Sequence, residues 1–389
     1  MTAMRTVLGI ALGVFSSLGT ACVLLILLGL LTWLGTLEQV HTGLFEVQKK
    51  YFESFVLLHD FGPFALPLPG ANLVLCLLFV NLSVGGIVRI RKNGATVGVL
   101  IAHSGILLLL VAGFVKNYFA DEGHVTLFEG QRSNHFQSYY LWEIAVQEPL
   151  GDGRVREHVV PGERFSDATG AQSVTLTTPE LPFDIEVHHF MRNAEPMPKG
   201  PKFDVAVPVL DGVFLKDMPM RTEAEANIAG VYATAVHRDG RREASILWGA
   251  QAAPWTIASG NQRWAIDLRK RRYPMPFTLA LADFRKEDHP RMNMPKSFES
   301  DVEVVEGASS RPVTISMNEP LRAGGLVLYQ ASWGPSNAAP GQPLFSTFAV
   351  VRNPADQYPL IACIIIAAGL VLHFARKLVR HIRLEAARS

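Results

Sequence analysis

One histidine in this sequence stands alone inside a long apolar stretch. His103 lies within Val99–Leu107, and it is the one titratable side chain, cysteines apart, in the first three charge-poor stretches of the chain. An ionisable group at membrane depth is costly and marks a functional site by default. Imidazole is also a common axial ligand of haem iron, so His103 is a candidate ligand for a haem iron. A second interpretation stays open, in which His103 is hydrogen-bonded across a helix bundle and has only a structural role.

The other histidines give weaker signals. His373 lies beside Arg376 and Lys377, which indicates a position at a membrane interface rather than in a ligand site. The remaining histidines of the middle segment lack the i, i+4 spacing with a carboxylate that is typical of a zinc protease. His188 and His189 are expected on opposite faces of a strand, which disfavours their binding one ion together. A structural role is expected for each member of this set: His41, His59, His124, His135, His158, His188, His189, His237 and His289.

Several classes of chemistry find no support in the motifs. The sequence has no C-x-x-C-H haem-attachment motif, no phosphate-binding G-x-x-x-x-G-K-S/T loop and no G-x-S-x-G nucleophile motif. All three cysteines lie in apolar stretches, so the middle segment is expected to have neither disulfides nor a thiolate metal site. A net charge of +1 gives no reason to expect a nucleic-acid partner.

Four charge-poor stretches predict four transmembrane helices. They are Thr6–Leu37, the interval from Asp60 to Arg89 with its core at Ala71–Val88, the interval from Lys92 to Lys116, and the interval from Asp356 to Arg376. Each can supply the ~20 residues that cross a hydrocarbon layer of ~30 Å. The first is too long for a cleavable signal peptide and is expected to be retained. The predicted fold class is an integral membrane, α-helical protein with a large extracytoplasmic, mainly-β domain.

Basic residues predict the orientation of these helices. Arg5 precedes the first helix, Arg89–Lys92 connects the second to the third, and Arg376–Arg383 follows the fourth. If the helices alternate in direction, all three clusters fall on one side, and the positive-inside bias places that side in the cytoplasm. We therefore expect a multi-pass protein of the cell inner (plasma) membrane, with both termini cytoplasmic. The predicted parts are residues 1–117 with three helices, an outer domain at 118–356 and a last helix with a basic tail at 357–389.

Two further patterns concern the membrane part. In the outer loop 38–70, apolar residues recur at three and four from Leu44 to Leu58, which predicts an amphipathic helix. Small residues also recur at helical spacing. They are expected to let neighbouring helices pack closely, and they are Gly9, Gly13 and Ser17 in the first helix and Gly98, Ala102 and Gly105 in the third.

The outer domain is expected to be a β sandwich or barrel, because short alternating runs are separated by Gly, Pro, Asn and Asp. Two stretches, Pro182–Phe190 and Pro276–Phe284, also share their spacing, which is either chance or the trace of a duplicated subdomain that makes two similar halves. The predicted strands are Val125–Phe128, Leu141–Gln147, Phe183–Phe190, Trp264–Leu268, Phe277–Phe284, Asp301–Val305, Val313–Met317, Leu326–Tyr329 and Phe345–Val351.

This layout resembles the ResB/CcsB family of cytochrome c biogenesis proteins, in which three N-terminal helices, a large outer domain and one C-terminal helix follow one another. The likeness spans nearly the whole chain in topology and is specific in a few short segments. They are Leu34–Gln39, His103–Gly113 with Gly123–Gln131, and Met317–Leu321 with Gly325–Trp333.

The resemblance implies a role in System II cytochrome c maturation. A subunit of this kind would carry haem b across the membrane and present it to the thiols of apocytochrome c. The family's intramembrane histidine matches His103, which would then be an axial ligand of haem iron. A CcsA/ResC-type membrane partner would supply the second intramembrane histidine and a Trp-rich segment, which is absent here because the six tryptophans are scattered. The implied partners are the CcsA/ResC-type protein, apocytochrome c and membrane lipid. This chain would then be the non-catalytic or haem-handling half of a two-subunit pair.

A second function class stays open from the residues alone. The chain could be a membrane-anchored β-domain scaffold or sensor that handles no haem. A neighbouring reading frame for a CcsA-like protein would favour the role in haem handling. A purified protein that is colourless even with its partner would favour the scaffold or sensor.

Overall fold

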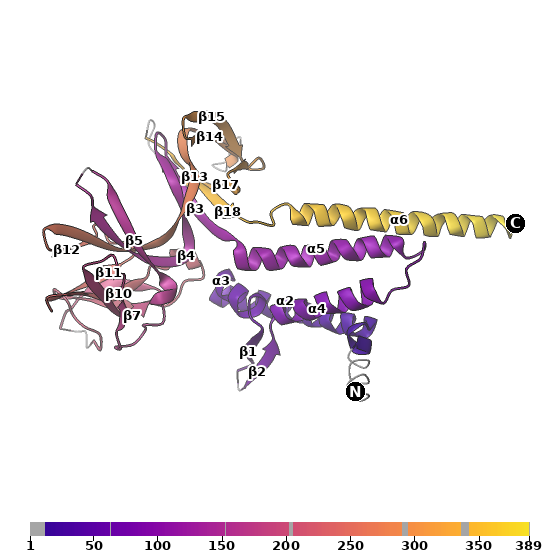
Figure 1. Ribbon diagram of the computed structural model, residues 1–389, viewed down its shortest axis with the longest axis horizontal. Helices are drawn as coiled ribbons and strands as arrows, with labels where there is room; N and C mark the ends of the chain where they lie inside the picture. The colour runs from indigo at the N-terminus through magenta and orange to yellow at the C-terminus, as the bar shows by residue number, and fades with distance from the viewer. Residues whose placement is uncertain are drawn as a thin grey trace. The chain divides into compact units, whose positions relative to one another are not determined.

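The computed structural model divides the chain into two compact units (Figure 1). The helical unit comprises residues 1–120 and 352–389, and the β unit comprises Asp121–Val351. The structure describes residues 12–62, 64–151, 153–201, 205–289, 295–335 and 342–388. The unit boundaries lie within a few residues of the predicted boundaries at 118 and 356.

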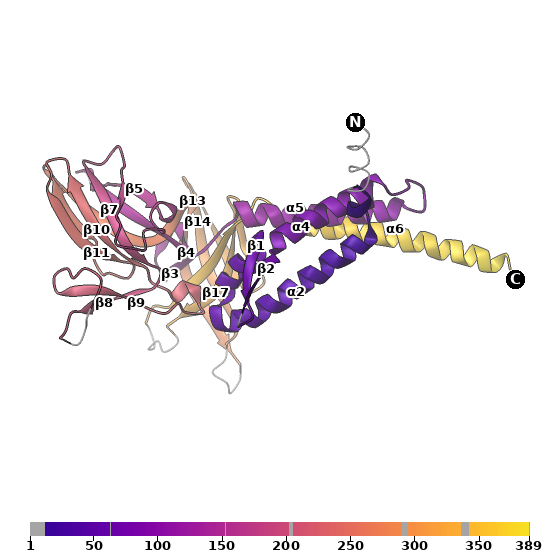
Figure 2. The same cartoon turned by 90° about the horizontal axis from the view of Figure 1, so that it is seen from below.

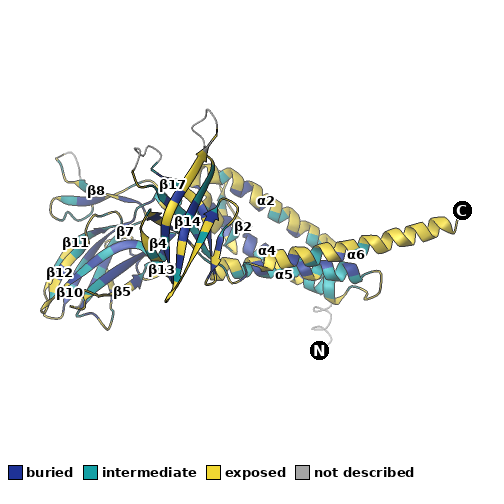
Figure 3. Ribbon diagram, turned by 90° about the horizontal axis from the view of Figure 1, so that it is seen from above, coloured by how far each residue is buried: buried dark blue, intermediate teal, exposed yellow. Residues whose placement is uncertain are grey.

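In the described residues of the helical unit, four helices are long and apolar enough to cross a membrane: α2 (Leu18–Thr42), the helix over Ala71–Val88, α5 (Val97–Phe119) and α6 (Tyr358–Ala386). The second begins as α4 (Ala71–Asn81) and continues as a π-helix, η2 (Leu82–Val88). The four expected helices are therefore confirmed. Their apolar side chains are largely exposed, most clearly along α6 (Figure 3), which is compatible with a multi-pass membrane protein.

The first of these helices is displaced from its predicted bounds of Thr6–Leu37. Ser17 caps the start of α2, because its hydroxyl accepts a hydrogen bond from the Gly19 amide at 3.1 Å. The helix then continues past Glu38 to Thr42, where Gly43 takes a positive φ of 85° and ends it. Residues 1–11 lie outside the described part of the chain, and Gly9 and the start of the predicted helix fall there.

Close contact through small residues is confirmed for α5 and is wrong for Gly13 and Ser17 of the first helix. A Cβ on Gly98 would lie 2.7 Å from the Gly369 carbonyl oxygen, and a Cβ on Gly369 would lie 2.5 Å from the Ala102 amide nitrogen. Glycine at these positions thus lets the backbones of α5 and α6 approach. Gly13, in contrast, has nothing within 4 Å of its Cβ position, and Ser17 serves as a helix cap.

The predicted amphipathic helix from Leu44 to Leu58 is also corrected. Helix α3 (Leu44–Val47) and the π-helix η1 (Gln48–Phe52) cover its first half, but a hairpin of β1 (Val56–Asp60) and β2 (Ala65–Pro69) replaces the second. The apolar spacing does continue into Phe55 and Leu58. These residues pair instead with β2, whose Pro67 and Pro69 disfavour a helix in that segment.

Among its described residues, the β unit has two large hydrophobic cores and a smaller one around Ala194, Leu215 and Tyr232. Its largest sheet has the path β15-β14-β13-β4-β3-β18-β17-β16, with β12 and β5 paired at the side, and a second sheet has the order β11-β10-β7-β6. Figure 2 shows β7, β10 and β11 at one end of the unit and β14 and β17 at the other. The strands are β3 (Asp121–Phe128), β4 (Arg132–Pro149), β5 (Val155–Pro161), β6 (Val174–Leu176), β7 (Phe183–Met191), β8 (Ala194–Pro198), β9 (Val213–Asp217), β10 (Gly230–His237), β11 (Arg242–Trp248), β12 (Trp255–Ser259), β13 (Gln262–Asp288), β14 (Pro295–Glu306), β15 (Ser309–Ser316), β16 (Leu321–Ala323), β17 (Leu326–Gly334) and β18 (Phe345–Arg352).

Two long strands belong to both large cores. Strand β4 places Ile144 in the first core and Phe136 in the second, and β13 does the same with Ile266 and Leu279. The predicted strands Trp264–Leu268 and Phe277–Phe284 are therefore parts of one strand, β13. Pairing with β4 holds the intervening residues extended, with register shifts around Lys270 and Pro274. The expectation of a large, β-rich domain is confirmed.

The two stretches of similar spacing lie in different sheets. Pro182–Phe190 leads into β7, which pairs with β10 and β6, and the next strand, β8, pairs with β9. Pro276–Phe284 lies in β13, which pairs with the strand that follows it, β14. The two stretches thus share an extended conformation but have different pairing partners.

Candidate functional site on the third apolar helix

His103 lies on α5 with its ring against the neighbouring π-helix. Its Nδ1 is 3.0 Å from the carbonyl oxygen of Gly86 in η2, and the side chain is half-buried. A Cβ on Gly86 would come within 2.6 Å of that nitrogen. Glycine at position 86 is therefore what allows the imidazole to reach the backbone. Single-turn π segments within helices are frequent at functional sites.

This hydrogen bond fixes the tautomer of His103. A carbonyl oxygen can only accept, so Nδ1 carries the hydrogen and donates it, and Nε2 of the neutral ring keeps its lone pair. Within the described ranges, no hydrogen bond reaches Nε2. Histidines that bind metals are commonly arranged in this way. One ring nitrogen binds the metal, and the other donates a hydrogen bond that fixes the orientation of the ring.

The geometry satisfies both interpretations of His103. The ring is hydrogen-bonded across two helices, as the structural interpretation requires, but that bond uses only Nδ1. Nε2 is left with the lone pair that an axial haem ligand needs. The residues present would therefore fit a haem iron, which Nε2 of His103 would hold while the Gly86 carbonyl orients the ring.

His103 lies toward the end of the helical unit where basic residues gather. It is six residues from the start of α5, or about 9 Å along the helix axis. At that end Arg89 donates to the Leu12 carbonyl at 3.0 Å and to the Ser16 hydroxyl, and Arg376 donates to the Gly94 carbonyl. The second and third basic clusters thus lie at the same end of the helical unit. Arg5, in the first, lies outside the described residues.

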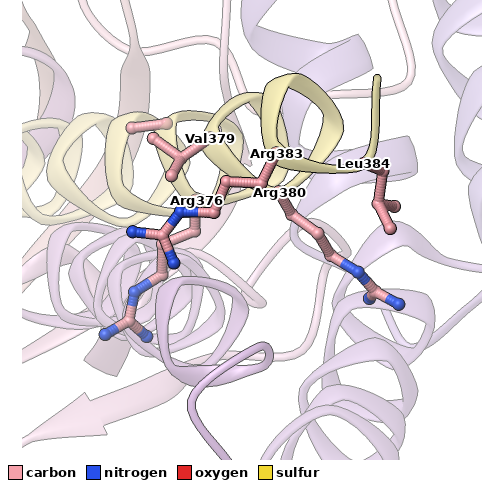
Figure 4. A pocket seen from close by; sticks show the side chains of 6 residues that line it. Arg376, Val379, Arg380, Arg383 and Leu384 are labelled. Atoms are coloured by element: carbon pink, nitrogen blue, oxygen red, sulfur yellow. The ribbon is translucent and has the colours of Figure 1, made fainter. Parts of the chain in front are cut away.

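The basic end of α6 carries a shallow hollow of about 460 Å³ (Figure 4). Arg376, Arg380 and Arg383 line it together with Val379 and Leu384. Guanidinium groups that alternate with apolar side chains suit a membrane interface, where phosphates lie next to hydrocarbon. His373 lies one turn earlier, with its backbone against Gly98 and its Nδ1 buried without a partner.

One expectation about the outer histidines is wrong. His188 and His189 do not lie on opposite faces, since their Nδ1 atoms are 2.7 Å apart and both rings contact Tyr232. His189 has a φ of +50°, and the register of β7 with β10 shifts there. This bulge turns the second ring to the side of the first. In the part of the chain that the structure describes, no cluster of three or more His, Cys, Asp or Glu side chains could hold a metal ion.

A partly buried network at the other end of the helical unit was missed by the sequence analysis. Glu38 near the end of α2 contacts Lys50 and Tyr51 of η1, and Tyr51 in turn contacts His59 of β1. His59 had been expected to be structural, on the ground that no ligand spacing surrounds it. The contacting side chains are 13 and 8 residues apart along the chain, and no regular helix or strand spacing connects them.

Comparison with known proteins supports the family resemblance. Residues 247–342 match the family model described as the ResB-like family. This segment runs from the end of β11 to shortly before β18 and contains the quoted stretches Met317–Leu321 and Gly325–Trp333. The resemblance to the ResB/CcsB family is therefore confirmed, and it suggests a role in cytochrome c biogenesis. A comparison with curated proteins finds no match.

Proposed function

We propose that this chain is the haem-handling subunit of a cytochrome c biogenesis system, which carries haem b across the membrane and presents it to apocytochrome c. The ResB-like match supports the biological role. The observation that carries the proposal is His103, whose Nδ1 is engaged by the Gly86 carbonyl while Nε2 keeps its lone pair.

His103 would bind and orient the haem through Nε2. The hydrogen bond to Gly86 holds the ring in one plane and one tautomer, so no proton has to leave Nε2 when a ligand arrives. A neutral imidazole is also far less costly to bury than a charged side chain, so His103 can remain in an apolar helix between loads. The bound haem supplies the vinyl groups to which cysteine thiols are later joined.

A second protein would supply the other axial ligand of the iron. His103 offers one of two axial positions of the iron. The exposed apolar faces of the helices offer room for a multi-span partner within the lipid. We propose a CcsA/ResC-type protein as the supplier of the second ligand, so that this chain is the non-catalytic half of the pair. Under this proposal the protein lies in the inner membrane, with both termini cytoplasmic and the β unit on the periplasmic face.

The absorption spectrum of the purified complex tests this function. The complex with its partner is expected to show a haem band, and a strain that lacks this chain is expected to lose its c-type cytochromes. Normal cytochrome c levels in that strain would contradict the proposed role. A colourless complex would favour a scaffold or sensor without haem.

A further inference from the structure

A hydrogen-bonded network lies around Tyr51 at the end of the helical unit opposite His103. Tyr51 is completely buried, and its hydroxyl lies 2.6 Å from Oε2 of Glu38. Lys50 Nζ holds the same carboxylate at 2.8 and 3.0 Å from its two oxygens. The Tyr51 hydroxyl also forms a short contact with Nδ1 of His59.

Proton accounting assigns the tautomer of His59. A tyrosine hydroxyl has one hydrogen, and the carboxylate of Glu38 can only accept it. A tyrosine hydroxyl ordinarily keeps its hydrogen at neutral pH, since the usual pKa of this group is about 10. The Tyr51 oxygen must then accept from His59, whose Nδ1 is the donor. Nε2 of a neutral His59 keeps its lone pair, as Nε2 of His103 does.

Aromatic side chains surround the His59 ring. Phe61 meets it edge to face with ring centres 4.6 Å apart, and Phe64 stacks on Phe61 at 5.7 Å. The side chain of His59 is 14% exposed, while Phe61 and Phe64 are 45% and 59% exposed. Leu58 on the same hairpin is exposed as well. A nitrogen ligand beside exposed aromatic surface suits a flat, apolar macrocycle that carries a metal.

The two histidines lie at opposite ends of one helical unit. The hairpin is tied to the beginning of α4, because the Gly70 amide donates to the Phe55 carbonyl at 2.8 Å and Asn72 donates to the Glu53 carbonyl at 2.7 Å. His103 contacts Gly86, near the end of the same helix. The fifteen-residue step from Ala71 to Gly86 corresponds to roughly 20 Å. Figure 1 shows the β1–β2 hairpin projecting from the helices.

We propose that Nε2 of His59 is a second iron-porphyrin ligand of this chain, with Tyr51 and Glu38 as positioning residues. The inference rests on the proposed function, since haem held at His103 would be the supply for His59. Donation from His59 through Tyr51 to a carboxylate makes Nε2 a stronger donor to iron, as in other histidine–carboxylate pairs. Removing the Tyr51 hydroxyl should therefore weaken binding at His59 and raise the reduction potential of the bound iron, and it should leave His103 unaffected.

Titration of the purified full-length protein with ferric haem b tests this inference by absorption spectroscopy. The wild type is expected to bind at two sites, and His59→Gly and His103→Gly are each expected to lose a different one. Tyr51→Phe should weaken the His59 site about 10–100-fold. Added imidazole should refill the site in His59→Gly, which shows that this variant is folded. His41→Ala, an exposed histidine of α2, is the matched control and should bind like the wild type.

The outcomes separate the two claims. If His59→Gly and Tyr51→Phe titrate like the wild type while His103→Gly loses haem, the inference about His59 is overturned and the proposed function stands. If His103→Gly titrates like the wild type while His59→Gly loses haem, the role of His103 fails and the His59 site stands. Unchanged binding in both glycine variants would overturn both.

Discussion

At the scale of single residues, the proposed haem site depends on one glycine as much as on one histidine. Gly86 contributes a carbonyl oxygen and the absence of a side chain, and both are needed for the contact with His103. We predict that Gly86→Ala displaces the imidazole and reduces haem content by about tenfold or more, the range typical for loss of a second group behind a ligand.

Gly113 provides the control for this prediction. It lies on the same helix as His103, and nothing is within 4 Å of its Cβ position. Gly113→Ala should therefore leave haem content unchanged. Equal haem content in the two variants, measured per mole of purified protein, would show that the Gly86 contact does not hold His103.

Lys270 gives the β unit a specific dependence on pH. Its Nζ donates to the Tyr139 carbonyl at 2.7 Å and lies 4.3 Å from the centre of the Trp142 ring, and burial lowers its pKa to about 8, while Glu225 acts in the opposite direction. Between pH 8 and about 10 the unfolded chain binds more protons than the folded one, so stability should rise with pH. Above that range stability should fall again, because burial raises the pKa of Tyr139 to about 12.

Thermal unfolding of the full-length protein across this pH range measures the effect. Lys270→Met should remove the rise in melting temperature between pH 8 and 10. Lys286→Met is the matched control, since Lys286 also lies over a tryptophan, Trp333, but is exposed. A rise that persists in Lys270→Met would assign the dependence to other groups.

Sequence reasoning reached His103 but not its partner. His103 stands out because it is the one titratable side chain, cysteines apart, in the first three charge-poor stretches, whereas Gly86 is one of many glycines in apolar stretches. Which carbonyl meets the ring depends on the register of two helices, and no local pattern encodes that register. The same holds for His59. It is recognised as a candidate ligand only from its contacts with Tyr51 and, through Tyr51, with Glu38 in the folded chain.

At the scale of elements, the contact between α5 and α6 explains how the C-terminal helix joins the other three. Gly98, Gly105 and Gly369 leave no space for larger side chains at this contact. We predict that Gly369→Leu separates the two helices and costs about 1–3 kcal/mol of stability, as overpacking does in other close contacts.

The melting temperature of the detergent-solubilised protein checks this prediction. Gly29→Leu on α2 is the control, because nothing lies within 4 Å of the Cβ position of Gly29. A melting temperature that falls for Gly369→Leu but not for Gly29→Leu is expected. Equal values would mean that the α5–α6 contact is loose.

Elements with a long, uniform pattern were the ones that the sequence predicted well. All four apolar helices and every predicted strand of the β unit are present, because hydrophobic length and alternation are local properties. The hairpin of β1 and β2 was not predicted. Its residues carry a helical spacing, and the decision between helix and strand depends on a partner segment that follows a turn.

At the scale of the whole molecule, the basic clusters give the protein its predicted orientation. Arg89 and Arg376 are each bonded to the backbone at the same end of the helical unit. We predict that a reporter active only in the periplasm is silent when fused after Arg383 and active when inserted next to Gly151, in the turn between β4 and β5. Reversed signals would contradict the proposed orientation.

The family match and the candidate ligand lie in different parts of the molecule. Residues 247–342 belong to the β unit, whereas His103 belongs to the helical unit. The match therefore supports a biological role without testing the ligand, and the ligand must be tested by itself.

The haem content of His103→Gly, purified with and without added imidazole, tests the central claim most directly. Glycine vacates the ligand position and introduces no buried charge, so the helix bundle should remain folded. We expect His103→Gly to lose haem and cytochrome c yield, and we expect imidazole to restore part of both by occupying the vacated position. Full haem and full yield in His103→Gly without imidazole would contradict the account, because His103 would then be a packing residue only.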